Sequence, residues 1–464
     1  MVNLDADEIF SGLKRLHFIG IGGSGMCPIV EILHSTGNYI ITGSDVDNES
    51  DTVKRIRGMG IPVAIGHRAE NIGDAQLLVY SAAIQKDNPE LLAAKEAGIH
   101  VFERSVMLGV LCRRYPNTIA ISGTHGKTTS SSMLAQILVT AGIDPTVFIG
   151  GKLPLIGGNG RVGNSDIMVC EACEFVDTFL QITPAIAVIL NIDADHLDYF
   201  GTLENVIRSF NKFLKQTSSL VVINGDDANS LKALEGVELP VITFGLGENN
   251  DYTAKNIRMN EGSHWEFELV HKGTSLADIT LQVPGRHNIY NALAAAAAAH
   301  VSGAIPQDIV NGLGSFTGAG RRYEVHGVFD GLTVADDYAH HPAEIEVTLK
   351  AVKEMHFNKV WAVFQPFTYT RTKNLLQEFA NALDIADQVI LTEIMPAREV
   401  DDLGVSSSQL QERINKPCKL LGSFEEIADY VIANAGSGDL VITMGCGDIY
   451  KCAKLIKQKL EAKD

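Results

Sequence analysis

Two glycine-rich segments of the sequence have the residue types that bind phosphate groups. The first, Gly20-Ile-Gly22-Gly-Ser-Gly25, has the spacing G-x-G-x-x-G. Glycines let the backbone approach a diphosphate, and the following helix supplies N–H donors and the positive end of its dipole. Asp45 lies twenty residues farther on, where an acid can bind ribose hydroxyls. The segment predicts a nucleotide site whose ligands are Gly22, Gly23, Ser24, Gly25 and Asp45, but it does not separate a nicotinamide dinucleotide from a nucleotide sugar.

The second segment, Gly123-Thr-His-Gly126-Lys127-Thr128-Thr129, has the Gly-Lys-Thr core of a phosphate loop. In such loops backbone N–H groups hold phosphates, the lysine contacts the terminal phosphates and the hydroxyl can bind Mg²⁺. The segment is shorter than the form G-x-x-x-x-G-K-[ST], because Ile121 stands where the first glycine would be. It predicts an ATP site that includes Gly123, Thr124, His125, Gly126, Lys127, Thr128 and Thr129.

Two clusters of acidic and imidazole side chains follow later strands. The first is Glu171-Ala-Cys-Glu174, and the second runs from Asn191 to Asp198 and contains Asp195-His196. Ligands of α/β proteins bind at the carboxyl ends of parallel strands, and a metal–triphosphate site needs such groups to hold Mg²⁺. Each acid alone is more typical of a helix cap or a solvated loop, but two clusters after the phosphate-loop strand favour a functional site.

The glycine loops and the acidic clusters all follow expected strands, and along the chain such strands alternate with helices. Buried strands are expected at seven short apolar runs before residue 241: Leu16–Gly20, Tyr39–Thr42, Leu77–Ser81, Thr118–Ser122, Ile167–Cys170, Ala185–Leu190 and Leu220–Ile223. Helical spacing separates many of them, as at Met26–Ser35, Ser130–Thr140 and Leu203–Leu214. This alternation predicts an α/β fold with parallel sheets that helices cover on both faces.

The pattern changes between Val241 and Val283 and then returns. Three consecutive short strands are predicted there, at Tyr252–Ile257, Trp265–Val270 and Leu276–Val283, hence a small antiparallel sheet. Further parallel strands are expected at Leu332–Ala335, Val360–Phe364, Gln388–Thr392 and Leu440–Met444. With breaks near Tyr115-Pro116 and in the glycine-rich stretch Gly314–Gly320, the chain divides into three α/β domains, residues 1–114, 115–320 and 321–464.

Four more polar segments flank expected strands or helices. Gly285-Arg-His-Asn288-Ile-Tyr-Asn291 opens an alanine-rich helix, and Asn288 and Asn291 share one of its faces. The others are Arg321-Arg322, Asp336–Pro342 and Phe364–Thr372. Taken by themselves, all four allow helix capping and surface ion pairs.

The order of these motifs resembles that of the Mur ligases of bacterial peptidoglycan synthesis. The likeness runs from His17-Phe-Ile-Gly-Ile-Gly-Gly to Met444-Gly-Cys-Gly-Asp-Ile-Tyr450 and includes all the segments quoted above. The resemblance implies a Rossmann-like N-terminal domain for the uridine diphosphate of a sugar nucleotide. It also implies a central P-loop-type ATPase domain and a Rossmann-like C-terminal domain that closes over ATP and binds an amino acid.

Within the family, the chain is most similar to the members that add L-alanine to UDP-N-acetylmuramate. The implied reaction uses ATP, with Mg²⁺, to convert the lactyl carboxylate into an acyl phosphate, which the amine of L-alanine then attacks. By motif match, Lys127, Glu171, His196 and Arg322 would be catalytic, and Thr128, Glu171 and His196 would bind the metal. Asn288, Asn291, Arg322 and Asp337 would bind ATP, and His340 and Arg371 would bind the amino acid.

Two positions depart from the family pattern. Several sibling ligases have a carbamylated lysine downstream of the Asp-His motif, and that position here is Phe210. This departure fits the type that adds L-alanine. Phe367 stands in the Gln-Pro-x segment where a histidine is expected, so that histidine's role is missing from this chain.

Composition limits the classes of partner. The net charge of −18 argues against nucleic acid and anionic membranes, because phosphate backbones need clustered Lys and Arg. The N-terminus predicts no signal peptide, and no apolar run is long enough to span a bilayer. Seven cysteines, an odd number, predict reduced thiols in the cytoplasm. Cys170-x-x-Cys173 lacks a second pair and predicts packing rather than zinc. A monomer or a homodimer is expected.

Three other functions compete with this interpretation. A recycling ligase of the same family, which adds a tripeptide to UDP-N-acetylmuramate, shares the Asp336–Pro342 segment, but the run from Gln365 to Thr372 favours the alanine type. A nicotinamide-dependent oxidoreductase would explain the first glycine loop and leave the Gly-Lys-Thr loop unexplained. A regulatory ATPase would leave the first loop without a purpose.

Overall fold

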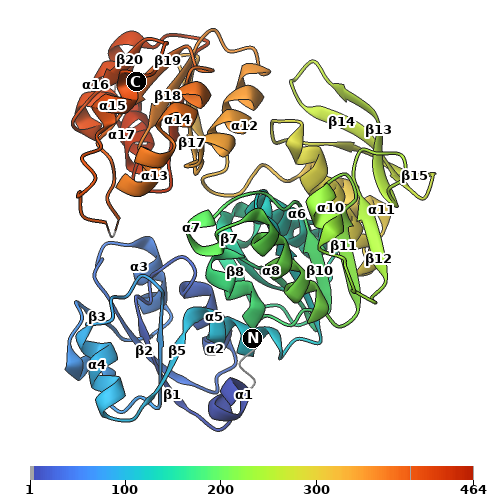
Figure 1. Ribbon diagram of the computed structural model, residues 1–464, viewed down its shortest axis with the longest axis vertical. Helices are drawn as coiled ribbons and strands as arrows, with labels where there is room; N and C mark the ends of the chain where they lie inside the picture. The colour runs from blue at the N-terminus through green and yellow to red at the C-terminus, as the bar shows by residue number, and fades with distance from the viewer. Residues whose placement is uncertain (1–4, 398, 463–464) are drawn as a thin grey trace. The chain divides into compact units, whose positions relative to one another are not determined.

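The computed structural model describes residues 5–397 and 399–462 (Figure 1). They form two compact units, which are treated separately below. The first unit comprises residues 5–256, 267–279 and 290–315, and the second comprises residues 257–266, 280–289, 316–397 and 399–462. The strands form three sheets, drawn in blue, in teal to yellow and in orange to red (Figure 1).

The first sheet has five parallel strands in the order β3-β2-β1-β4-β5. Its strands are β1 (Arg15–Ile19), β2 (Ile40–Asp45), β3 (Val63–Ile65), β4 (Leu77–Tyr80) and β5 (His100–Glu103). The helices of this part are α1 (Asp5–Phe10), α2 (Cys27–Ser35), α3 (Asp51–Gly58), η1 (Ala69–Ile72), α4 (Pro89–Glu96) and α5 (Arg104–Cys112). The strand order reverses between β1 and β4, and such a reversal opens a crevice at the carboxyl ends of the strands.

The second sheet has ten strands in the order β15-β14-β13-β12-β11-β10-β6-β9-β7-β8. They are β6 (Asn117–Ser122), β7 (Thr146–Leu153), β8 (Gly158–Arg161), β9 (Ile167–Glu171), β10 (Ile186–Ile189), β11 (Leu220–Asn224), β12 (Val241–Phe244), β13 (Tyr252–Met259), β14 (Trp265–His271) and β15 (Thr274–Thr280). The strands from β12 to β9 are parallel, and β8 runs antiparallel to β7.

Short connections join β13, β14 and β15, which are neighbours in the sheet. Only two residues link β14 to β15, so these strands must be antiparallel, as predicted. The helices that follow or connect the strands of the second sheet are α6 (Lys127–Thr140), η2 (Pro154–Ile156), η3 (Phe175–Gln181), α7 (Leu197–Phe200), α8 (Leu203–Lys215), α9 (Ala228–Lys232), α10 (His287–Val301) and α11 (Pro306–Gly314).

The third sheet has six strands in the order β16-β17-β21-β18-β19-β20, and β16 alone is antiparallel to its neighbour. The strands are β16 (Glu324–Phe329), β17 (Leu332–Asp337), β18 (Val360–Phe364), β19 (Gln388–Leu391), β20 (Cys418–Leu420) and β21 (Leu440–Met444). The helices are α12 (Pro342–Lys353), α13 (Tyr369–Asn374), α14 (Leu376–Leu383), α15 (Ser407–Gln411), α16 (Phe424–Asn434) and α17 (Tyr450–Glu461).

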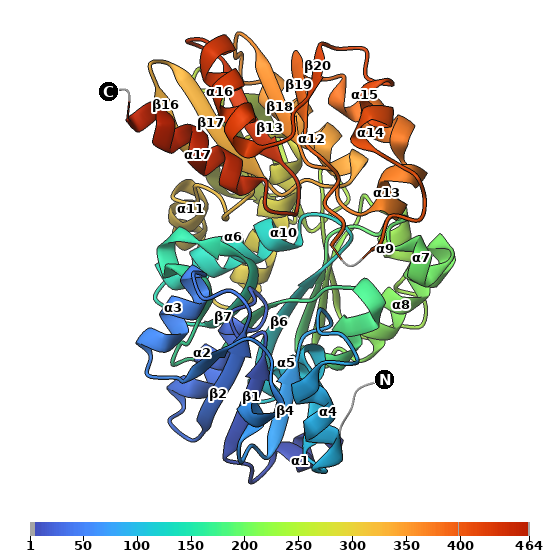
Figure 2. The same cartoon turned by 90° about the vertical axis from the view of Figure 1, so that its left-hand side faces the viewer.

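Strand β18 shows why helices cover both faces of the third sheet. Its five residues are all buried, and successive side chains point to opposite faces. Val360, Ala362 and Phe364 join one apolar core with α12, α14 and α15. Trp361 and Val363 join the other core with α16 and α17 (Figure 2). The α/β architecture with mostly parallel sheets is therefore confirmed.

Seven strands were not predicted from the sequence: β3, β5, β7, β8, β12, β16 and β20. All three residues of β3 are half-buried, and the first three residues of β12 are not fully buried. The third antiparallel strand begins and ends two or three residues earlier than predicted. Within the described residues, no helix is both long and apolar enough to cross a membrane.

Candidate active site

The phosphate loop lies between β6 and α6, and two neighbouring strands bring the acidic clusters to the same edge of the second sheet. Strands β9 and β10 pair with β6 on either side, in parallel. Glu171 ends β9, and the segment that begins at Asn191 follows β10. Carboxyl ends of adjacent parallel strands meet at one edge, so the predicted Mg²⁺ and phosphate residues of the central part are brought together.

Glycine is required at two positions of this loop. Gly123 has φ +147°, and a methyl group there would lie 3.0 Å from Cβ of Leu190. Gly126 has φ +85°, and a methyl group there would overlap Oδ1 of Asn291. Gly126 is the N-cap of α6, so Lys127, Thr128 and Thr129 occupy its first turn, and Thr128 is buried. The N–H groups of a helix start are thus available for phosphate.

Lys127 is held by carbonyl groups of its own loop and by a buried carboxylate. Its Nζ donates to the carbonyl oxygens of Gly123 (2.6 Å) and Thr124 (3.0 Å) and lies 2.9 Å from Oε2 of Glu174. Glu174 is only 2% exposed. Burial lowers the pKa of Lys127, but the negative charge of Glu174 outweighs burial, so that the pKa is raised above its usual value. The lysine therefore stays charged.

Asn191 fixes the phosphate loop to the segment after β10. Its Oδ1 accepts a hydrogen bond from the backbone N–H of His125 (2.8 Å), and its Nδ2 donates to the carbonyl of the same residue (3.1 Å). The backbone N–H of Thr124 donates to the carbonyl of Asn191 (3.0 Å). Thr124 in turn accepts from the N–H of Asp193 through its hydroxyl (2.9 Å). These bonds give the loop one conformation.

The other predicted metal ligands lie around the same carboxylate. Nε2 of His196 is 4.0 Å from Oε1 of Glu174, and its ring contacts Phe175 at a centroid distance of 4.7 Å. Oε2 of Glu171 accepts from the N–H of Gly150 (2.9 Å), and the negative charge of Glu171 acts on Lys127. Within the described residues, no group of three or more His, Cys, Asp or Glu side chains is arranged to hold a metal by itself.

This donor set fits Mg²⁺ bound partly by a nucleotide. Mg²⁺ prefers oxygen ligands and usually takes one or two carboxylates together with phosphates and water. The carboxylate of Glu171 and the hydroxyl of Thr128 are such ligands, and His196 lies 4.0 Å from Glu174 of the first cluster. In such a complex the phosphates and water complete the coordination, so one or two protein carboxylates suffice.

Asn291 and Asn288 occupy the first turns of α10 in different surroundings. Oδ1 of Asn291 accepts from the hydroxyl of Ser130 in α6 (3.1 Å), so Asn291 lies beside the phosphate-loop helix. Nδ2 of Asn288 donates to the carbonyl of Pro284 (2.6 Å). Asn291 thus belongs to the first compact unit, together with the phosphate loop, whereas Asn288 belongs to the second unit.

The first glycine loop follows β1 at the point where the strand order reverses. Oδ2 of Asp45 accepts from the N–H of Gly22 (2.9 Å), and its Oδ1 accepts from two backbone N–H groups after β2. Asp45 is buried and holds the loop in place. The N–H of Gly23 donates to Gly20, and the carbonyl of Ser24 accepts from Nδ2 of Asn159.

The second unit brings Arg322 together with Asp337. Oδ1 and Oδ2 of Asp337 accept from the N–H groups of Ala339 and Tyr323, both at 2.8 Å. Burial raises the pKa of Asp337, and the charge of Arg322 opposes this effect. The guanidinium of Arg322 lies over the ring of Tyr338, 5.2 Å from its centroid. Arg321 has a structural role, because its Nε donates to Asp336 (2.8 Å).

His340 belongs to the same cluster through Glu344. Nδ1 of His340 lies 3.1 Å from Oε2 of Glu344, and the backbone N–H of His340 donates to the same oxygen (3.0 Å). Burial alone would raise the pKa of Glu344, but His340 and Arg322 lower it well below its usual value. The cluster therefore contains the guanidinium of Arg322, the imidazole of His340 and two carboxylates.

Arg371, in α13, has a buried donor without a partner. Its Nη1 is inaccessible to solvent and makes no hydrogen bond within the described residues. Its charge acts on the nearby thiol of Cys446, whose pKa burial raises to about 12. An unpaired buried N–H of a guanidinium is costly unless an anion binds it. This feature is compatible with an amino-acid carboxylate.

The two positions that depart from the family pattern have structural roles. Phe210 is fully buried in α8, and its ring packs edge-on against Phe179 at 5.2 Å. Phe367 forms an isolated parallel bridge with Met395. Neither side chain offers a polar group to a ligand.

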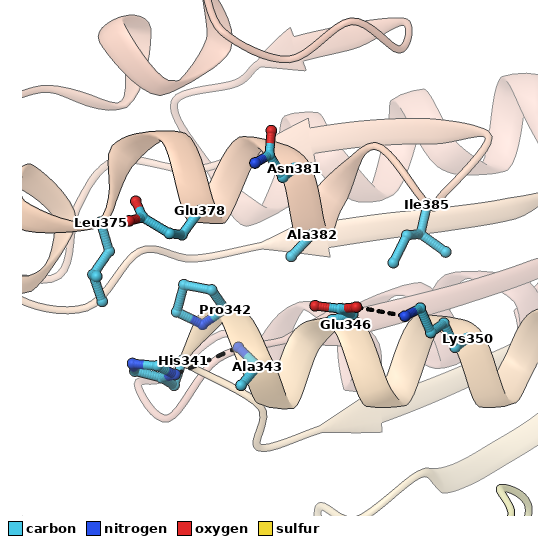
Figure 3. Close-up of a pocket in the computed structure, with 10 residues that line it drawn as sticks. All are labelled: His341, Pro342, Ala343, Glu346, Lys350, Leu375, Glu378, Asn381, Ala382 and Ile385. Atoms are coloured by element: carbon cyan, nitrogen blue, oxygen red, sulfur yellow. Dashed lines mark hydrogen bonds and ion pairs between the residues drawn. The ribbon is translucent and has the colours of Figure 1, made fainter. Parts of the chain in front are cut away.

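A pocket of about 490 Å³ lies between α12 and α14, within the second unit (Figure 3). Pro342, Glu346 and Lys350 face it from α12, and Leu375 and Ala382 face it from the segment that contains α14. None of the residues predicted to bind ligands lines this pocket. It is therefore separate from the predicted site residues.

Sequence reasoning missed two residues of the central site. It quoted Glu174 within the first acidic cluster and Asn191 at the start of the second, but it assigned neither a role. In the structure Glu174 forms an ion pair with Lys127, and Asn191 holds the phosphate loop by a hydrogen bond to its backbone. Their nearness to the Gly-Lys-Thr segment comes from strand pairing, which no local pattern shows.

Comparisons with known proteins cover nearly the whole chain. Residues 15–116 match "Mur ligase family, catalytic domain", residues 121–299 match "Mur ligase middle domain" and residues 321–447 match "Mur ligase, glutamate ligase domain". The UDP-N-acetylmuramate–L-alanine ligase of Acetivibrio thermocellus is 45% identical over 448 residues, which are 95% of each chain.

Solved structures agree with these matches. The UDP-N-acetylmuramate-alanine ligase MurC of Thermotoga maritima superimposes with a TM-score of 0.83 at 27% identity, over 97% of this chain and 100% of that one. A murein peptide ligase from Psychrobacter arcticus shares the fold, with a TM-score of 0.74 at 23% identity over 97% and 99% of the two chains. The chain thus belongs to the Mur ligase family.

Proposed function

We propose that this protein joins L-alanine to the lactyl carboxylate of UDP-N-acetylmuramate at the expense of ATP. The products are UDP-N-acetylmuramoyl-L-alanine, ADP and phosphate, for peptidoglycan synthesis. The observation that carries the proposal is the grouping of Lys127, Glu171 and His196 at the ends of three adjacent strands, in a chain that is 45% identical over 95% of its length to a ligase of that name.

The first step is transfer of the γ-phosphoryl group of ATP. A lactyl carboxylate oxygen attacks the γ-phosphorus, the bond to the β-phosphate oxygen breaks, and ADP leaves. Two anions must approach each other, so positive charge near the γ-phosphate lowers the barrier most. Lys127 and the N–H groups of residues 123–129 would supply that charge. Mg²⁺, held by Thr128, Glu171 and His196, would neutralise phosphate oxygens.

The second step forms the amide bond. The amine of L-alanine attacks the carbonyl carbon of the acyl phosphate, loses a proton, and phosphate leaves. His340 and Arg371 are the proposed ligands of the amino acid, which is supported by the unpaired buried Nη1 of Arg371. Arg322 would bind phosphate, Asp337 the ribose of ATP, and Asn288 and Asn291 further groups of ATP.

The sugar nucleotide would bind in the N-terminal domain, at Gly22, Gly23, Ser24 and Gly25, with Asp45 nearby. We place the three domains at residues 1–114, 115–320 and 321–464, a division supported by the three sheets. A cytoplasmic location is supported by seven free thiols. The charge of −18 supports small molecules rather than nucleic acid as partners of a monomer or homodimer.

The test is phosphate release from ATP with Mg²⁺ and UDP-N-acetylmuramate, measured with L-alanine, with the tripeptide L-Ala-D-Glu-meso-diaminopimelate, and with neither. We expect release that depends on L-alanine. Release that depends on the tripeptide would assign the chain to recycling, and release with neither would make it an ATPase. A change in nicotinamide fluorescence on mixing would support an oxidoreductase.

A further inference from the structure

Arg104 is the first residue of α5, and its guanidinium lies against the first glycine loop. A methyl group on Gly25 would lie 3.0 Å from Nη1, 3.3 Å from Cζ and 3.4 Å from Nε of Arg104. The two residues are far apart in the sequence and come from different strand–helix connections of the first sheet. The guanidinium is half-buried.

Arg104 differs from the other half-buried arginines of the first unit in having no anionic partner. Its guanidinium makes no hydrogen bond or ion pair to any residue in 5–397 or 399–462. The others each pair with a carboxylate, as in Arg15–Asp74 (3.0 Å), Arg55–Glu31 (2.8 Å), Arg113–Asp7 (2.7 Å) and Arg161–Asp144. A half-buried guanidinium that pairs with no carboxylate can bind an anionic ligand, because leaving such a charge unpaired is costly.

Unpaired backbone donors lie beside the same charge. The N–H groups of Gly22, Gly23 and Cys27 all donate within the protein, to Asp45, Gly20 and Gly23. The N–H groups of Ser24 and Gly25 make no hydrogen bond within the described residues. They lie just before Met26, the N-cap of α2, whose positive dipole end attracts anions.

Helix α5 holds Arg104 in a fixed position. The carboxylate of Glu103 accepts from the N–H of Ser105 (2.8 Å) and so caps the helix. Near the end of the helix, Arg113 donates to the carbonyl of Gln181 (2.9 Å). Gly109 lies so close to that carbonyl that a methyl group would overlap it. A side chain on such a helix loses little freedom when a ligand binds.

We propose that Arg104, with the N–H groups of Ser24 and Gly25, binds the diphosphate of the sugar nucleotide. This inference rests on the proposed function and adds a cation that the glycine motif does not contain. A guanidinium matches two phosphate oxygens at once, which a lone lysine cannot do. The diphosphate position at the start of a helix after G-x-G-x-x-G lies next to Gly25.

The test measures binding of UDP-N-acetylmuramate and of UDP-N-acetylglucosamine, which has the same diphosphate and lacks the lactyl carboxylate. In Arg104→Ala we expect the affinity for both to fall by about 10- to 100-fold. Arg104→Lys should recover part of the loss. The KM for ATP should change less than about twofold. Lys95→Ala, an exposed cation on α4, is the control for net charge.

Three results would overturn the inference. Unchanged affinity of Arg104→Ala for both sugar nucleotides would exclude Arg104 as a ligand. A loss confined to UDP-N-acetylmuramate would assign Arg104 to the lactyl carboxylate. A loss of ATP binding in both Arg104 variants, with a lower unfolding temperature, would make its role structural. If the unmodified protein bound neither sugar nucleotide, the proposed function itself would fail.

Discussion

The loops at Gly20–Gly25 and Gly123–Thr129 both connect a parallel strand to a helix, and each is accompanied by a fully buried glutamate. In the second loop the lysine is part of the motif, and the buried Glu174 holds it at 2.9 Å. Near the first loop, the buried Glu90 of α4 accepts hydrogen bonds from the side chains of His17, Ser44 and Asn71. The cation nearest that loop, Arg104, comes from another helix.

Similar strand–helix turns can therefore obtain their positive charge from different parts of the molecule. A loop that carries its own cation needs a counter-charge before ATP binds, and Glu174 provides it. A loop without a cation depends on tertiary packing to bring one. At the first loop that cation is Arg104, which has no carboxylate partner within the described residues. Four substitutions test the comparison, and they are ordered by the size of the expected effect.

Lys127→Ala should separate the two loops most clearly. We expect phosphate release to fall at least about 100-fold, because the cation at the transferring phosphate is lost. Affinity for UDP-N-acetylmuramate, measured by calorimetry, should stay within about twofold. Lys212→Ala, an exposed cation on α8, is the matched control. A comparable loss of phosphate release and of UDP-N-acetylmuramate affinity would contradict the assignment of separate ligands to the two loops.

Glu90→Gln should change how stability depends on pH. Burial raises the pKa of Glu90, but bonds from His17, Asn71 and Ser44 outweigh burial and lower it to about 2. A lowered carboxyl pKa stabilises the fold above pH 4.5, and this contribution is lost as pH falls toward 2. It amounts to about 3 kcal/mol.

Denaturant unfolding of the Glu90 variant between pH 5 and pH 2 measures this contribution. The unmodified protein should lose about 3 kcal/mol more unfolding free energy than Glu90→Gln. Glu96→Gln, an exposed position at the C-terminal end of α4, should behave like the unmodified protein. Parallel curves for all three proteins would show that the network around Glu90 is not charged.

Gly126→Ala should weaken ATP binding about tenfold, because its methyl group would overlap Oδ1 of Asn291. Gly142→Ala is a matched control, since Gly142 also has a positive φ (+73°) but has open space around it. Both variants should lose about 1 kcal/mol of stability through backbone strain. Only Gly126→Ala should raise the KM for ATP, and equal KM values in the two variants would disprove the contact.

Asn191→Ala should have the smallest effect, about a fivefold higher KM for ATP. It removes two hydrogen bonds to the backbone of His125, each contributing about 1 kcal/mol. Asn211→Ala is the control, because it likewise removes two side-chain hydrogen bonds to the backbone. Both go to carbonyl groups away from the loop, those of Ala233 and Glu235. The control should lose stability and keep its KM, whereas a raised KM in both would indicate a general loss of packing.

The sequence predicted the fold well where local pattern and tertiary structure agree. Apolar runs such as Thr118–Ser122 and Val360–Phe364 are strands within one residue of their predicted bounds. The short strands β3 and β20 were not predicted, because none of their residues is fully buried and each lies at the edge of its sheet. Their existence depends on neighbouring strands rather than on their own composition.

Residue types and spacing by themselves determined the two phosphate-binding turns, the buried parallel strands and the family resemblance. Glycine's conformational freedom and the helix start are local properties, so a short segment contains all the information. Only the tertiary structure decided that Glu174 holds Lys127, that Asn191 clamps the loop and that Arg104 reaches Gly25. These contacts join residues tens of positions apart, and only the pairing order of the strands and the packing of helices set such distances.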